Sequence, residues 1–119
     1  MTLREDADYI VKEAIRRVLP DEAVAAALKG KSFGSGRLYL VAAGKAAWQM
    51  AKTAVELLED RLEKGIVITK YDHVKGALPR ISCYEAGHPV PDENSVLATQ
   101  AALDMVADLQ EGDTVLFLL

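Results

Sequence analysis

The sequence predicts an α/β fold in which helices flank a parallel β-sheet. Short runs rich in Leu, Val and Ile, typical of strands buried on both faces, occur at 38–43, 66–69 and 114–119. Segments with apolar residues at helical spacing separate these runs. A long helix between two strands allows them to run parallel, so we expect right-handed strand–helix–strand units.

Two helices are expected before the first strand. Residues 3–19 predict an amphipathic helix that ends at Pro20. Its apolar stripe consists of Ala7, Ile10, Val11, Ala14, Ile15 and Val18. Asp21 is expected to cap a second, short helix at 23–28, and Gly30 is a suitable residue to end it.

The central stretch passes from a strand through a single glycine, Gly44, into a helix that we expect to run to about Lys64. Lys45 stands at the turn, where the first amide groups of a helix lack internal partners. These amides, the positive end of the helix dipole and the ammonium group favour an anion such as phosphate or carboxylate. The alternative is a solvated lysine with no function.

Two common phosphate-binding motifs are excluded at this turn. A Walker A loop requires glycine where Tyr39 stands, and serine or threonine where Ala46 stands. A dinucleotide-binding fingerprint is present only in degenerate form, and Thr69 and Lys70 occupy the place of the acidic ribose ligand. Binding of NAD is therefore weakly supported.

Two later loops contain further candidate site residues. Lys70 and His73 follow the second strand, at the carboxyl end where ligands bind in open α/β sheets. A third strand is expected at 81–86, followed by the proline-rich loop 87–95 with His88. Asp92 or Asn94 is expected to cap the next helix, with Glu93 favouring its dipole and apolar positions reaching Leu109. For each of these residues, an ordinary loop or capping role is the alternative to a functional role.

Composition narrows the function classes. The chain has 119 residues, a formal net charge of −4 and one cysteine, Cys83, in an apolar segment typical of a buried thiol. Without a basic patch, nucleic acid is not an expected partner. No apolar run approaches the roughly 20 residues that span a bilayer, so we expect a cytoplasmic protein without membrane contact. The apolar end, 114–119, predicts a fragment of a longer protein.

Four motifs in this order resemble the bacterial and archaeal glycerate 2-kinases of the MOFRL class. The motifs are VAAGKAAWQMAK at 41–52, GIVITKY at 65–71, YEAGHPVPDEN at 84–94 and DTVLFLL at 113–119. The resemblance covers essentially the whole chain. One departure is Asp72, where the family commonly has glycine; aspartate tolerates a left-handed backbone better than most residues.

The resemblance implies ATP-dependent phosphorylation of D-glycerate to 2-phosphoglycerate, with ATP and Mg²⁺ as cofactors. It also implies that residues 1–119 are the first half of a larger, Rossmann-like N-terminal domain. The rest of that domain and a C-terminal domain would be absent, and the isolated chain inactive. The resemblance makes Lys45 a functional residue and places the loop 88–93 near the cleft. Together with the positions discussed above, the candidate site residues are Lys45 as the catalytic residue, Gly44, Lys45, Ala46 and His88 as substrate or phosphate ligands, and Lys70, His73, Asp92 and Glu93 as further candidates, with no metal ligand assigned.

Three other functions remain open from the sequence. One is a non-catalytic α/β module that binds an anion, and another is a stand-alone flavodoxin-like module. The third is an NAD(P)-dependent enzyme of the hydroxypyruvate reductase type, the label of some relatives. Apolar strand edges also predict association, so a homo-oligomer is expected.

Overall fold

The computed structural model describes residues 2–119. The elements are α1 (Leu3–Val18), α2 (Pro20–Leu28), β1 (Leu38–Ala43), α3 (Ala47–Leu58), the 3₁₀ turn η1 (Glu59–Arg61), β2 (Leu62–Lys70), β3 (Ile81–Ala86), α4 (Glu93–Met105) and β4 (Thr114–Leu118). The four strands form one sheet in the order β3-β2-β1-β4, and every neighbouring pair is parallel. The predicted α/β fold with a parallel sheet is therefore confirmed.

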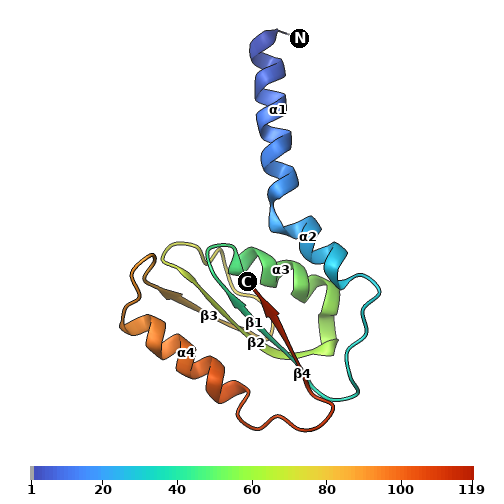
Figure 1. Ribbon diagram of the computed structural model, residues 1–119, viewed down its shortest axis with the longest axis vertical. Coiled ribbons are helices and arrows are strands. Elements are labelled where there is room, and N and C mark those ends of the chain that lie inside the picture. The colour runs from blue at the N-terminus through green and yellow to red at the C-terminus, as the bar shows by residue number, and fades with distance from the viewer. Residues whose placement is uncertain (1) are drawn as a thin grey trace.

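The sheet lies between two helical layers, with α3 on one face and α4 on the other (Figure 1). Alternate residues of β1 face opposite layers. Leu38 and Leu40 pack into the cluster that contains α3, whereas Tyr39 and Val41 pack into the cluster with Met105 of α4. Burial of each such side chain contributes about 1.5–3 kcal/mol. The expectation that β1 is buried on both faces is thus confirmed.

The register of β1 and β2 aligns their carboxyl ends. Val41 pairs with Ile66 and Ala43 with Ile68. Gly65 of β2 lies against Leu40, where an added Cβ atom would meet the Leu40 carbonyl oxygen at 2.8 Å and the Ile81 side chain at 2.6 Å. Only glycine lets the strands approach in this register.

We predict that Gly65→Ala lowers the free energy of unfolding by about 1–3 kcal/mol, because backbone atoms of β1 must move to admit the methyl group. Urea unfolding followed by circular dichroism measures the change. The matched control is Gly30→Asn, at a left-handed position (φ +70°) with open space around it, where we expect a change within about 0.5 kcal/mol. Equal stabilities of the Gly65 variant and the wild type would refute the packing argument.

The expected end of the central helix, about Lys64, is wrong. Helix α3 ends at Leu58, η1 follows, and β2 begins at Leu62. Glu59 has a positive φ of 46°, which breaks the helix, and Leu62 is 1% exposed in its ladder with Leu38. The charged residues around this bend have the pattern of an exposed helix face, which is why the sequence predicts a longer helix. Some of them belong instead to the start of β2.

The expectation that the last strand is buried is also wrong in the described residues. β4 pairs only with β1, at the edge of the sheet, and Phe117 is 54% exposed. Its start is firmly tied to β1. The buried Asp113 carboxylate accepts hydrogen bonds from the Arg37 amide (2.7 Å), the Arg37 guanidinium (2.9 Å) and the Gln110 amide (2.8 Å).

These bonds, first the Gln110 amide and then the Arg37 groups, hold the pKa of Asp113 below its ordinary value. A carboxylate with a lowered folded-state pKa stabilises the fold fully above the unfolded value of about 4, and this stabilisation is lost as pH falls through the folded value. We therefore predict that the wild-type chain loses stability below about pH 4, and that Asp113→Asn is less stable near neutral pH but loses less on acidification. Urea unfolding at a series of pH values checks this; parallel pH profiles of the two proteins would contradict it.

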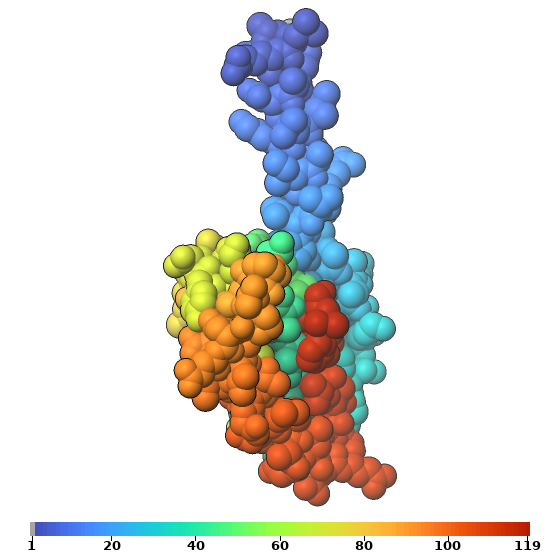
Figure 2. All heavy atoms as spheres, turned by 60° about the vertical axis from the view of Figure 1, so that its left-hand side comes forward, coloured from blue at the N-terminus to red at the C-terminus, as the bar shows by residue number. Residues whose placement is uncertain are grey.

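The two N-terminal helices form as expected, but the apolar stripe of α1 is not buried. α1 extends away from the body of the molecule (Figures 1 and 2). Asp21 does not cap α2: Leu19 is the N-cap, and the Asp21 carboxylate instead accepts from Gln49 of α3. Among residues 2–119, no helix combines the length and apolar character needed to cross a membrane.

Candidate functional site

The carboxyl ends of β1, β2 and β3 surround a small cavity of about 150 Å³. The loop after each strand contributes to its lining. The candidate residues that line it are Gly44, Lys45, Lys70 and His88. Four residues from three separate sequence motifs therefore meet at one place, as the position of ligands in open α/β sheets predicts.

Lys45 lies in the turn between β1 and α3, as expected. Gly44 has a φ of +115°, which favours glycine, and its amide donates to the Ile68 carbonyl of β2 at 3.1 Å. The buried Thr69 hydroxyl lies 3.4 Å from the Lys45 carbonyl oxygen, to which it donates. Both contacts fix the backbone of the turn to β2 and leave the exposed Lys45 side chain beside the cavity.

The N-terminus of α3 differs from those of the other long helices. α1 and α4 both begin with a capping box, in which a side chain accepts from the first turn. α3 begins after Ala46, and no side chain caps it. The Ala47 amide donates to the Gly44 carbonyl oxygen at 3.2 Å, but no side chain in the described part of the chain accepts from the amides that follow, and the partial positive charge of the helix end favours an anion there.

A second hollow of about 330 Å³ shares Lys45 with this cavity and includes Ala46, His73 and Lys75. Its wall is held by Trp48, whose indole donates to the Gly76 carbonyl at 3.0 Å. His73 thus lies on the other side of the Lys45 turn and not with His88. Larger hollows exist at the opposite end of the sheet and beside η1, but they do not include any of the predicted site residues.

In the described part of the chain, Asp92 and Glu93 do not line the cavity at the strand ends or the second hollow beside it. Asp92 is the N-cap of α4 and accepts from the Ser95 amide at 3.2 Å. It also accepts from the Tyr71 hydroxyl at 2.6 Å, and Asn94 donates to that same hydroxyl at 3.0 Å. We call Tyr71, Asp92 and Asn94 the loop clasp, because they join the loop after β2 to the loop with His88.

The clasp has an electrostatic signature. The hydrogen bond from Tyr71, followed by that from the Gly87 amide, holds the pKa of Asp92 below its ordinary value. The same contact with Asp92 raises the pKa of Tyr71. Asp92 therefore stays ionised and Tyr71 protonated near neutral pH. The loop with His88 is also tightly packed, because Gly87 lies against the Val90 carbonyl oxygen and an added Cβ atom would clash with it.

We predict that Tyr71→Phe loosens the His88 loop, because the ring remains while the bond to Asp92 is lost. Amide hydrogen exchange of Gly87, His88 and Val90 should become about twofold faster or more, with the sheet unaffected. Tyr9→Phe, on the distant α1, is the matched control. Unchanged exchange in the Tyr71 variant would show that the clasp does not hold the loop.

The sequence did not point to several residues that build the site. Thr69 and Trp48 look like ordinary strand and helix residues, and Tyr71 has no local signal, because its partners lie more than twenty positions away. Glu85 is similar: it accepts from the Val74 amide and fixes the loop after β2. The left-handed backbone expected to be tolerated at Asp72 is present, with φ +67°.

The side chains that could bind a metal ion are not clustered in the described residues. Within residues 2–119, the structure does not bring three His, Cys, Asp or Glu side chains together in a group able to hold a metal ion. Cys83 is half-buried, and burial raises the pKa of its thiol. The described residues therefore do not fit a complete Mg²⁺ site.

Comparison with known proteins agrees with the motifs. The profile of a family described as "Domain of unknown function (DUF4147)" matches residues 6–119. A D-glycerate 2-kinase from Thermotoga maritima is 49% identical over 118 residues, 99% of this chain and 28% of that protein. A glycerate 2-kinase from Pyrococcus horikoshii is 39% identical over 129 residues, covering 100% of this chain and 29% of that protein. The chain thus spans less than a third of the length of these relatives.

Solved structures give the same result. The crystal structure of a glycerate kinase from Thermotoga maritima superposes with a TM-score of 0.88 at 50% identity, over 98% of this chain and 28% of that one. A protein from Pyrococcus horikoshii superposes with a TM-score of 0.79 at 36% identity, over the same shares of the two chains. We conclude that the chain belongs to the DUF4147 family and is similar over nearly its whole length to part of proteins named glycerate 2-kinase.

Proposed function

We propose that this chain is the N-terminal part of an ATP-dependent D-glycerate 2-kinase and supplies an anion-binding part of its active site. The observation that supports this most is the convergence of Lys45, Lys70 and His88 at one cavity, with the uncapped α3 N-terminus two residues after Lys45. Phosphoryl transfer requires mainly positioning and the neutralisation of charge. Two ammonium groups and a helix N-terminus can position an anion and neutralise its charge.

The residues take distinct roles in this proposal. Lys45 and the amides after Ala46 hold either the glycerate carboxylate or the transferring phosphate, and Lys45 stabilises charge in the transition state. Gly44 lets the backbone turn close to the anion. His88 orients the substrate from the opposite loop, and Lys70 adds a second positive charge. Lys75, which lines the second hollow with His73, adds positive charge on the far side of the turn.

The size of the cavity supports an inactive isolated chain. A space of about 150 Å³ suits a carboxylate or a phosphate group, whereas sites for larger ligands occupy about 300–1,000 Å³. The nucleotide would need further surface. Mg²⁺ accompanies ATP in this reaction class, but its ligands would have to come from the nucleotide or from outside the described residues. No catalytic step is therefore assigned to Mg²⁺ in this chain.

We predict that Lys45→Ala in the active kinase lowers kcat/KM for D-glycerate by at least about tenfold, equivalent to about 1.4 kcal/mol of transition-state stabilisation. Coupled assays of ATP-dependent D-glycerate phosphorylation measure this. Lys31→Ala, outside both cavities, is the matched control. Unchanged kinetics in the Lys45 variant would remove this residue from the mechanism.

A second candidate function is reduction of hydroxypyruvate with NAD(P). A protein from Agrobacterium vitis that carries the provisional name hydroxypyruvate reductase is 40% identical over 86 residues. β2, however, ends at Thr69 and Lys70, where a dinucleotide site usually places an acidic ribose ligand. Titration with NADH, followed by its fluorescence, separates the two functions: the kinase proposal predicts no saturable binding.

The proposal extends to partners and location. The net charge of −4 supports a small-molecule substrate in preference to nucleic acid. A single cysteine fits a reducing compartment, and we place the protein in the cytoplasm.

A further inference from the structure

The apolar stripe of α1 is a candidate interaction surface. Its residues are Ala7, Ile10, Val11, Ala14, Ile15 and Val18. Ile10 is 64% exposed, Ile15 55% and Val18 81%, and α1 has no buried residue. Figure 2 shows the helix standing clear of the remainder of the molecule. An amphipathic helix normally buries such a stripe, so this surface requires a partner.

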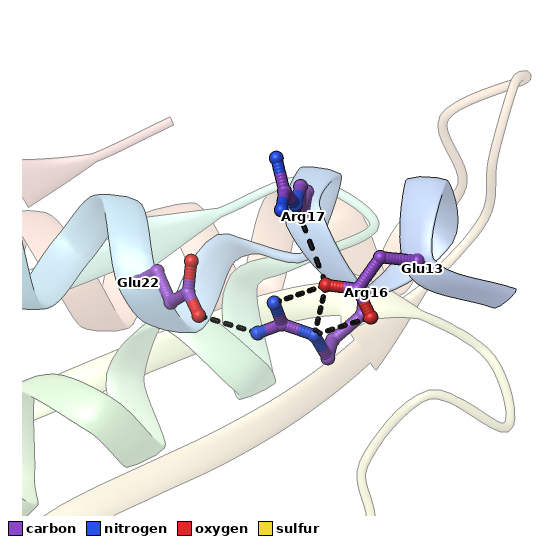
Figure 3. Close-up of polar contacts among 4 residues, drawn as sticks. All are labelled: Glu13, Arg16, Arg17 and Glu22. Atoms are coloured by element: carbon purple, nitrogen blue, oxygen red, sulfur yellow. Dashed lines mark hydrogen bonds and ion pairs between the residues drawn. The ribbon is translucent and has the colours of Figure 1, made fainter. Parts of the chain in front are cut away.

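The helix is held in this exposed direction. Arg16 of α1 pairs with Glu13 on its own helix and with Glu22 of α2, 2.6 Å away, across the bend at Leu19 (Figure 3). Arg17 adds a longer contact with Glu13 at 3.3 Å. A capping box also fixes the first turn of α1. The stripe is therefore presented by an ordered helix whose end is linked to α2.

The charges of α1 change sign along its length. The first half contains Glu5, Asp6 and Asp8 against a single Arg4. The second half contains Lys12, Arg16 and Arg17 against a single Glu13. A second copy of α1 laid antiparallel would place each acidic half beside a basic half, and would also oppose the two helix dipoles favourably.

We propose that α1 pairs antiparallel, through its apolar stripe, with α1 of a second copy of this chain. Asp8 and Lys12 lie four residues apart and therefore share one flank of the helix. If a twofold axis passes near Ile10 and Val11, this flank meets the same flank of the second copy. Asp8 of each copy then lies beside Lys12 of its partner, because a twofold contact is reciprocal. No ion pair within residues 2–119 involves Asp8 or Lys12. Both are thus available to a partner.

The charge pattern favours a second copy over a membrane surface, since helices that lie on membranes concentrate positive charge on the polar face. The helix of 16 residues is only about 24 Å long, so the contact is small. We therefore expect a weak dimer whose population depends on the protein concentration.

Sedimentation velocity of the 119-residue chain over about 1–500 μM tests the proposal. The wild type should shift from monomer to dimer. Asp8→Lys or Lys12→Asp alone places like charges together and should raise the dissociation constant about fivefold or more. The double exchange should restore association, and so should mixing the two single variants. Lys31→Asp, away from α1, is the matched control and should change nothing.

Three results would overturn the proposal. One is a monomer at every concentration, as expected if further sequence covers α1 in the whole protein. Another is association that the single charge reversals do not weaken, which would indicate non-specific apolar contact. The third is failure of the double exchange to restore the dimer. Circular dichroism of each variant checks that the substitutions, at exposed positions of α1 and of the loop after α2, leave the fold intact.

Discussion

The parallel pairing of β1 with both β2 and β4 is the interaction on which the rest of the structure depends. β1 is the only strand of the described sheet with nearly every residue buried, and it divides the apolar side chains between the α3 and α4 layers. Its parallel register also brings the carboxyl ends of three strands to one edge. Packing and site geometry therefore have the same origin.

The proposed anion site follows from how the chain leaves β1. Gly44 turns with a positive φ, its amide bonds to β2, and Thr69 bonds to the next carbonyl. The helix that starts after this turn has no capping side chain, whereas α1 and α4 are capped. Leaving a helix end uncapped costs about 1 kcal/mol, and a bound anion would recover part of that cost. The clasp between Tyr71 and Asp92 then holds the opposite wall, with His88, in place.

Much of this was predictable from local sequence. Buried strands have a composition of their own, and the order of strands and helices along the chain implies a parallel sheet, so Lys45, Lys70 and His88 could be placed at one edge in advance. Contacts between distant residues could not be predicted. The Tyr71–Asp92 bond, the end of α3 at Leu58 and the exposure of α1 depend on neighbours that periodicity does not reveal. Asp92 was a candidate ligand because an acidic cluster serves capping and catalysis equally well.

The most direct test of the central claim, that residues 1–119 hold an anion at the carboxyl edge of the sheet, is a ¹H–¹⁵N NMR titration of this chain. D-glycerate and inorganic phosphate would be added separately, with chloride at matched ionic strength as the reference. The account predicts saturable shifts in the amides of residues 44–48 and in His88, with smaller changes at Lys70. Shifts confined to the hollow lined by Lys64, Tyr84 and Met105, or no saturable shift with either anion, would contradict it.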